Sequence, residues 1–219
     1  MPIVTPPRPS LYPTRSSAGS HLGQQLAARG HKGCMLLGIT PEGVEIAAHA
    51  AKAMGTQFDV LVAAFIKLGS NLAPIGAMAE SAPAEMDPDF QPAMNLLEKL
   101  SAAIDESRAR VKQDLVLYRT QRPVKNLQGR TAIIIDGQIV YPWKVLAAAK
   151  AAEGLGAREV IIASPVATQA AAERIRARQY NLVCPSVVME PEGHPSPYGD
   201  AGGEAPEKLK SIMIAHQAA

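Results

Sequence analysis

Aromatic residues, cysteines and unbalanced charge are all scarce in this chain. Of its 219 residues, 4% are aromatic and two are cysteines, and the formal net charge is +2. Two cysteines cannot build the disulfide framework of a small secreted protein, so we expect Cys34 and Cys184 to be buried thiols in a cytoplasmic protein. The small charge is spread along the sequence without a basic stripe, which gives no indication of nucleic-acid binding. No run of about 18 or more apolar residues occurs, so no membrane contact is expected.

Residues that commonly bind metals or act as nucleophiles are not clustered either. The five histidines are scattered, and neither cysteine stands at metal-ligand spacing from another ligating residue. No Ser-His-Asp series can be placed on a strand-turn-helix motif. The sequence therefore predicts no protein-held metal and gives no support to a hydrolase.

One stretch of the chain has the pattern of a parallel βαβ unit. Three isoleucines at 133–135 end at Asp136, an alanine-rich helical run follows at 145–152, and a second apolar run occupies 159–164. Apolar strands joined by a helix are typical of a parallel sheet that is covered on both faces. Ligands bind outside the carboxyl ends of such strands, so Asp136 is a candidate site residue, although an aspartate there can equally be a helix N-cap.

The whole pattern predicts an α/β fold. Three more strand-length apolar runs lie at 34–39, 58–63 and 181–184. We therefore predict a doubly wound, mostly parallel sheet of about five strands. The small residues, prolines and acids of 69–89 interrupt the apolar pattern and predict an irregular, mobile segment, and 92–117 predicts a long amphipathic helix.

The domain organisation follows from composition. We predict one domain at 14–188, preceded by an extended N-terminal tail at 1–13, which is rich in proline. Residues 189–219 read as a Pro/Gly-rich linker followed by a C-terminal helix at 206–216. That helix has one apolar stripe, so it docks on the core of its own chain or on a partner.

Several segments resemble, in the same order, sequence blocks of one enzyme family. Residues 129–136 and 165–167 resemble the core of type I phosphoribosyltransferases, specifically of stand-alone bacterial phosphoribosyltransferase-like proteins. Residues 15–22 resemble the family's opening block, R-x-x-A-G-x-x-L, and residues 36–44 resemble its block L-G-x-P-R-G-G-V. Further similar blocks lie at 59–62, 75–80 and 118–123. The resemblance implies the type I phosphoribosyltransferase-like fold, with a small hood or hairpin region at 69–89.

The resemblance also implies a reaction, in which a nitrogen nucleophile displaces pyrophosphate from phosphoribosyl pyrophosphate (PRPP), usually with magnesium. In the family, a loop with the pattern D-D-G-x-A-T-G-A-T holds the ribose through its acids and wraps the 5′-phosphate. In this chain Asp136 keeps the first acid and Gly137 replaces the second. The phosphate-binding Thr-Gly-Ala-Thr becomes Tyr-Pro-Trp-Lys at 141–144. The PRPP loop is therefore degenerate.

The replacements in this loop are unfavourable for a phosphate. Pro142 removes a backbone N–H donor, and Trp143 adds bulk where glycine would let the backbone approach. We interpret Tyr141 and Trp143 as pocket-filling residues. Lys144 either supplies a point charge to a ligand or is a solvated helix residue.

A second loop, which binds pyrophosphate in the family, is degenerate too. The family pattern Pro-Arg-Gly-Gly is replaced by Thr-Pro-Glu-Gly at 40–43, so an arginine is lost and an acid is gained. We interpret this loop as a helix start, with Thr40 as N-cap and Pro41 as the first helical residue. Lys67 lies near the position of the family's R-K-x-G block, and it is either a ligand-binding lysine or a surface lysine at a strand end.

Three hypotheses follow. The leading one is a pseudoenzyme: a phosphoribosyltransferase-fold protein that has lost PRPP-dependent transfer and acts as a binding or structural subunit. The second is a diverged phosphoribosyltransferase, a glycosyltransferase of pentosyl groups, which uses PRPP or another phosphorylated sugar or nucleotide with Asp136 at the ribose site. The third is a non-catalytic nucleotide sensor in which Tyr141 and Trp143 stack on a base. Burial of Trp143 against the core favours the first hypothesis, and a Trp143 that lines an open cleft favours the other two.

By resemblance, the candidate ligand-binding residues are Asp136, Gly137, Lys144 and Lys67. No cofactor is expected, and Mg²⁺ enters only if PRPP binding is retained. As partners, we expect a second copy of the chain or another protein that recruits it to an assembly, since symmetric dimers are the commonest oligomers.

Overall fold

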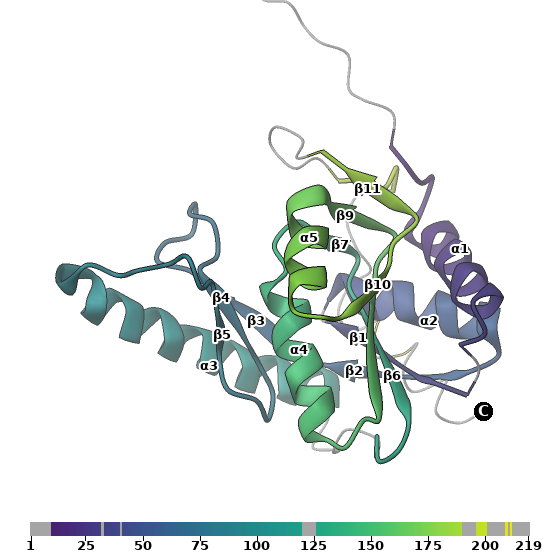
Figure 1. The fold of residues 1–219 in the computed structure, drawn as a ribbon, viewed down its shortest axis with the longest axis horizontal. Coiled ribbons are helices and arrows are strands. Elements are labelled where there is room, and N and C mark those ends of the chain that lie inside the picture. The colour runs from purple at the N-terminus through teal and green to yellow at the C-terminus, as the bar shows by residue number, and fades with distance from the viewer. Residues whose placement is uncertain are drawn as a thin grey trace, which may run out of the picture.

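Five parallel strands form the centre of the protein (Figure 1). The computed structural model describes residues 10–31, 33–39, 41–119, 126–189 and 196–200, together with residues 209 and 211. In spatial order the strands are β10 (Asn181–Val183), β8 (Glu159–Ala163), β6 (Thr131–Ile135), β1 (Met35–Ile39) and β2 (Gln57–Leu61). Every neighbouring pair is parallel. The predicted doubly wound sheet of about five strands is confirmed.

Helices cover both faces of this sheet. Figure 1 shows α1 (Arg15–Ala28) and α2 (Glu42–Met54) on one side, and α4 (Trp143–Gly154) and α5 (Gln169–Ala177) on the other. The isoleucines of β6 alternate between the two faces, because successive side chains of a strand point in opposite directions. Ile133 and Ile135 belong to the core cluster shared with α1 and α2, whereas Ile134 belongs to the cluster shared with α4. The continuous apolar run of this strand is thus explained by burial on both faces.

Local sequence signals set the helix starts. Thr14 caps α1: its Oγ1 accepts a hydrogen bond from the backbone N–H of Ser17, whose hydroxyl oxygen accepts one from the N–H of Thr14. Thr168 caps α5, as its Oγ1 accepts from the N–H of Ala171 at 3.2 Å. The prediction for α2 was wrong by one residue, since Pro41 is the N-cap and the helix begins at Glu42. Residue 40 lies outside the described residues.

A second, smaller parallel sheet continues the last three strands of the main sheet. It consists of β7 (Gln138–Ile139), β9 (Val166–Thr168) and β11 (Ser186–Val188), in the order β11-β9-β7. Each follows a main-sheet strand after a break of two residues. This sheet was not predicted. It builds over the carboxyl edge of β6, β8 and β10, so that edge is covered by the chain itself.

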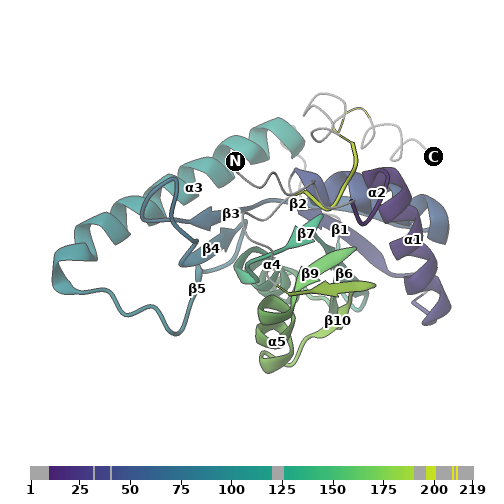
Figure 2. The ribbon, with the colours of Figure 1, turned by 90° about the horizontal axis from the view of Figure 1, so that it is seen from above.

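The predicted hood is present as an antiparallel sheet beside a long helix. Its strands are β3 (Ala63–Ile66), β4 (Gly76–Ala79) and β5 (Glu85–Met86), in the order β3-β4-β5. The predicted strand at 58–63 is in fact two, because β2 ends at Leu61 and the chain enters the hood as β3. A 3₁₀ turn (Met94–Leu96) leads into α3 (Leu97–Arg119), which extends away from the main sheet (Figures 1 and 2).

The buried stripe of α3 differs from the one that its apolar residues suggest. Met94, just before the helix, and Val116 are 88% and 72% exposed, whereas Ser107 and Asp114 are buried. Ser107 donates a hydrogen bond to the carbonyl of Ala64 at 3.3 Å, which meets the cost of burying its hydroxyl. Small and polar residues therefore face the hood strand.

Ion pairs join the hood to the body. The carboxylate of Glu85, whose side chain is 3% exposed, pairs with Lys150 of α4 and with Arg178. Arg174 of α5 pairs with Asp87 at 3.3 Å and with Asp89 at 2.8 Å. A buried carboxylate requires such compensation, so the hood is fixed against the α4–α5 side.

The packed part of the chain includes pieces of both predicted terminal segments. Tyr12 is 8% exposed and forms an isolated parallel bridge with Tyr198, and Leu209 is 1% exposed in the core cluster of α1 and α2. Residues 1–9, 190–195 and most of the predicted C-terminal helix lie outside the described residues. Among the residues that the structure does describe, no helix combines the length and the apolar character needed to cross a membrane.

Candidate functional site

The topology places the candidate site between β1 and β6. The chain leaves β1 towards β2 on one side and continues to β8 and β10 beyond β6, so the strand order reverses between β1 and β6. In open parallel sheets, ligands bind outside the strand ends at this point. The segments 41–43 and 136–144, which follow β1 and β6, both lie at this edge of the sheet.

These two loops lie in direct contact. A Cβ on Gly43 would collide with the carbonyl oxygen of Ile135, and a Cβ on Gly137 would lie 2.8 Å from the Cβ of Glu42. Both glycines are therefore needed for close packing of one loop on the other.

Asp136 is committed to interactions within the chain. It is 2% exposed, its Oδ1 accepts a hydrogen bond from the N–H of Gly137 at 2.8 Å, and its Oδ2 lies 3.3 Å from Nζ of Lys144. The alternative of a helix N-cap is wrong, because Pro142 is the N-cap of α4. Lys144 is not a solvated helix residue either: its side chain is 15% exposed, and its Nζ lies 5.0 Å from the centre of the Phe65 ring.

Trp143, the first residue of α4, is packed into the protein. It is 3% exposed, its Nε1–H donates to the carbonyl of Pro74 at 3.1 Å, and the guanidinium of Arg174 lies 5.4 Å from its ring centre. Tyr141 is half-buried and meets Phe65 edge-on, with ring centres 6.4 Å apart. The aromatic side chains join the hood to α4, and burial of Trp143 matches the condition that favours the first hypothesis.

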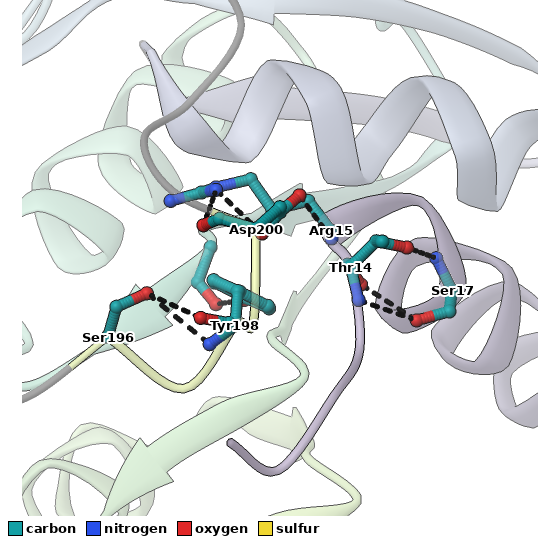
Figure 3. A network of polar contacts seen from close by, with 7 residues as sticks. Thr14, Arg15, Ser17, Ser196, Tyr198 and Asp200 are labelled. Atoms are coloured by element: carbon teal, nitrogen blue, oxygen red, sulfur yellow. Dashed lines mark hydrogen bonds and ion pairs between the residues drawn. The ribbon is translucent and has the colours of Figure 1, made fainter. Parts of the chain in front are cut away.

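A segment near the C-terminus covers the same strand ends. The hydroxyl of Tyr198 donates a hydrogen bond to the carbonyl oxygen of Gly137, and the ring is 5% exposed. Burial, followed by the negative charges of Glu42 and Asp136, raises the pKa of Tyr198, so the phenol stays protonated and acts as a donor. Figure 3 shows the neighbouring ion pair between Arg15 and Asp200, at 2.9 Å.

Sequence reasoning did not find the roles of Arg15, Tyr198 and Asp200. Arg15 belongs to the opening block that resembles the family, which was the one available signal, but no partner for it could be named. Residues 198 and 200 stand in a stretch rich in glycine and proline that has no periodicity. Contacts between residues this far apart in sequence require the folded sheet.

An open groove lies between β3 and α3. The groove has a volume of about 1110 Å³, and Lys67 and Lys144 both line it, as does Phe65. Lys67 is exposed at the end of β3, while Lys144 reaches the groove from α4. The rest of its charged lining comes from α3 and has mixed sign: Lys99, Glu106, Arg110 and Asp114. Asp136 does not line this groove, so the predicted residues do not form one continuous site.

The donor set at the strand ends does not fit a protein-held magnesium ion. Magnesium prefers several oxygen ligands in octahedral geometry, and the carboxylate of Asp136 is already neutralised by Lys144. Across the described part of the chain, no group of three or more His, Cys, Asp or Glu side chains is placed to hold a metal.

Comparison with known proteins gives relatives in sequence and in structure. No protein-family model matches the chain. Two curated Mycobacterium tuberculosis proteins, from strains CDC 1551 / Oshkosh and ATCC 25618 / H37Rv, carry the name "Putative phosphoribosyl transferase". Each is 28% identical over 178 residues, a match that covers 80% of this chain and 40% of the relative. The match thus spans less than half the length of these relatives.

A solved structure is similar over nearly its whole length. The crystal structure of the protein TT1426 from Thermus thermophilus superposes with a TM-score of 0.74 at 26% sequence identity, covering 93% of this chain and 98% of that one. With the parallel five-stranded sheet and the small antiparallel sheet, these findings agree with the ordered sequence blocks. The chain has an α/β fold with a five-stranded parallel sheet and a small antiparallel sheet, it is similar in structure to TT1426, and its sequence is similar to those of two proteins named as phosphoribosyl transferases.

Proposed function

We propose that this phosphoribosyltransferase-fold protein does not transfer phosphoribosyl groups from PRPP and acts as a binding or structural subunit. The observation that carries the proposal is the closure of the strand ends from three directions. Trp143 fills the phosphate turn, the loop of Glu42 packs on Gly137, and Tyr198 covers that same residue.

The chemistry of the remaining groups supports this proposal. A 5′-phosphate needs several converging N–H donors, and Pro142 at the start of α4 offers none. Glu42 stands in the loop that would receive pyrophosphate, so it would repel that anion. The ribose-binding acid, Asp136, already has Lys144 as its counter-ion. Each part of PRPP thus meets a group that is unsuitable or occupied.

A diverged enzyme is the second candidate, and the groove between β3 and α3 is the observation in its favour. Lys67 and Lys144 line that groove together and could both interact with an anionic ligand. A nucleotide sensor that stacks a base on Trp143 has less support, because the ring is buried and one of its neighbours is the guanidinium of Arg174.

Pyrophosphate release tests the proposal. The purified chain is incubated at high concentration with PRPP, Mg²⁺ and a mixture of purine, pyrimidine and small amine acceptors, and pyrophosphate is measured over hours. We expect release at the rate of protein-free controls. A rate above the controls would contradict the proposal and support the diverged enzyme, and its loss in Asp136→Ala or in Lys67→Ala would show which of these residues takes part.

A further inference from the structure

Residues 196–200 cross the strand ends as an extended segment. The N–H of Tyr12 donates to the carbonyl of Pro197 at 3.0 Å, and the N–H of Gly199 donates to the carbonyl of Tyr12 at 2.9 Å. This pairing resembles the addition of an extended peptide to a strand edge, in which main-chain bonds hold the peptide and side chains give specificity. The segment is held at the edge of the candidate site by residue 12.

Its side chains present a ring, a hydroxyl donor and a carboxylate to the body of the protein. The phenol of Tyr198 donates to the carbonyl oxygen of Gly137, and the guanidinium carbon of Arg15 lies 4.8 Å from the centre of its ring. The carboxylate of Asp200 accepts hydrogen bonds from the backbone N–H of Arg15 at 3.0 Å and from Nη1 at 2.9 Å. Arg15 and Gly137 of the α/β body between them contact all three groups.

The side chain of Arg15 is not required to start α1. The helix start is already capped by Thr14 and Ser17, which exchange hydrogen bonds between their side chains and backbones (Figure 3). The side chain of Arg15 is nevertheless 5% exposed, and the carboxylate that compensates its buried charge comes from Asp200. A buried guanidinium beside a strand-end carbonyl is an arrangement that can bind an anion with a hydroxyl group.

We propose that residues 196–200 are a built-in competitor at this site: they occupy a place that a small anion bearing a hydroxyl group takes when the segment is released. Arg15 then pairs with the anion in place of Asp200, and the carbonyl of Gly137 accepts from the ligand hydroxyl in place of Tyr198. This inference rests on the proposed function, because it explains one of the three closures of the strand ends as reversible. A sugar phosphate and a hydroxy acid share the required chemistry.

Competition of this kind lowers affinity in proportion to the closed fraction. A ligand that binds only the released state has an apparent dissociation constant equal to its intrinsic value divided by the fraction released. Weakening the segment therefore tightens ligand binding without any change in the ligand's own contacts. A segment that is merely a structural part of the fold would show no such gain.

The test uses the full chain with the substitutions Tyr198→Phe and Asp200→Asn, singly and together, and ribose 5-phosphate as the probe. Phenylalanine removes the hydroxyl and keeps the ring, and asparagine removes the charge and keeps the size. We expect the double variant to bind the probe at least tenfold more tightly than the wild type in a calorimetric titration. A peptide with the sequence of residues 196–200, Ser-Pro-Tyr-Gly-Asp, should compete with the probe, and lactate in a parallel arm separates a carboxylate ligand from a phosphate ligand.

Two controls make the result specific. Tyr180→Phe removes a tyrosine hydroxyl that donates to Glu153 at 2.9 Å, far from the segment, and should leave probe binding as in the wild type. Arg15→Gln in the double variant should remove the gain. Thermal unfolding of each variant shows whether it is folded. If the double variant does not fold, the single variant Asp200→Asn is used in its place.

The outcomes separate this inference from the proposed function. If a folded variant binds no more tightly than the wild type, or if the peptide does not compete, the inference is overturned while the proposed function stands. If the wild type itself binds PRPP and turns it over, the proposed function fails. The ratio of the dissociation constants of ribose 5-phosphate for the variant and the wild type still decides the inference.

Discussion

Replacement of Trp143 by alanine is the most informative perturbation of the turn at 141–144. The side chain is 3% exposed, and truncation of a buried tryptophan to alanine costs about 3–5 kcal/mol. It also leaves the carbonyl of Pro74 without the indole N–H that lies 3.1 Å away. For a chain of this size, about 4 kcal/mol corresponds to a decrease of roughly 8–16 °C in Tm. Trp143→Phe keeps an aromatic ring and should cost about 1–3 kcal/mol, largely through the lost hydrogen bond.

Urea unfolding followed by far-ultraviolet circular dichroism measures these differences. Fluorescence cannot be used for the variants, because Trp143 is the single tryptophan of the chain. Met94→Ala is the control, since that side chain is 88% exposed and its truncation should change stability by less than about 0.5 kcal/mol. A loss below about 1 kcal/mol for Trp143→Ala would refute the view that the indole is part of the core, and would instead favour a ring that lines an accessible pocket.

Two further predictions concern the hood and a thiol. Removing both cations that face Glu85, by Lys150→Met with Arg178→Met, leaves a buried carboxylate uncompensated and should lower the free energy of unfolding in urea by about 3–5 kcal/mol. Glu85→Gln instead frees two half-exposed cations to water and should cost about 1 kcal/mol. A larger loss for Glu85→Gln than for the double variant would contradict the role of Glu85 as the buried member. Burial raises the pKa of Cys184 from 9.0 to about 11, which lowers the fraction of thiolate. Alkylation of Cys184 by iodoacetamide at pH 8, measured by peptide mapping, should therefore be about 100-fold slower in the folded chain than in urea. Equal rates in the two states would contradict this burial.

The main sheet could be predicted because its strands carry strong local signals. Four of its five strands, β1, β2, β6 and β8, are five residues long and largely buried, and β10 lies within the run predicted at 181–184. The β7, β9 and β11 strands were missed because two or three residues contain too little periodicity to indicate a strand. Their pairing depends on the main sheet holding the preceding strands side by side.

The inner face of α3 shows a different limit of sequence reasoning. Hydrophobic periodicity predicts that Ser107 and Asp114 face outward, but both side chains are buried in the structure. Arg110, four residues before Asp114, supplies a counter-ion at 3.2 Å, and the hood strand supplies an acceptor for the hydroxyl of Ser107. Such compensation comes from particular neighbours and cannot be derived from a hydrophobic pattern.

At the candidate site, the sequence identified the residues but not their partners. Asp136, Trp143 and Lys144 were singled out from the resemblance, and the structure pairs Asp136 with Lys144 across a loop whose path the sequence does not determine. Tyr198 reaches the same loop from a position 61 residues further along the chain. The closure of the strand ends is thus a property of the tertiary structure.

Calorimetric titration of the full chain with PRPP and Mg²⁺, in parallel with Asp136→Ala, tests the central claim most directly. If the strand ends are closed by Trp143, Glu42 and Tyr198, no heat of binding should appear at millimolar PRPP for either protein. Micromolar binding that is lost in Asp136→Ala would contradict the account, because it would show that the strand-end acid still holds the ribose of this substrate.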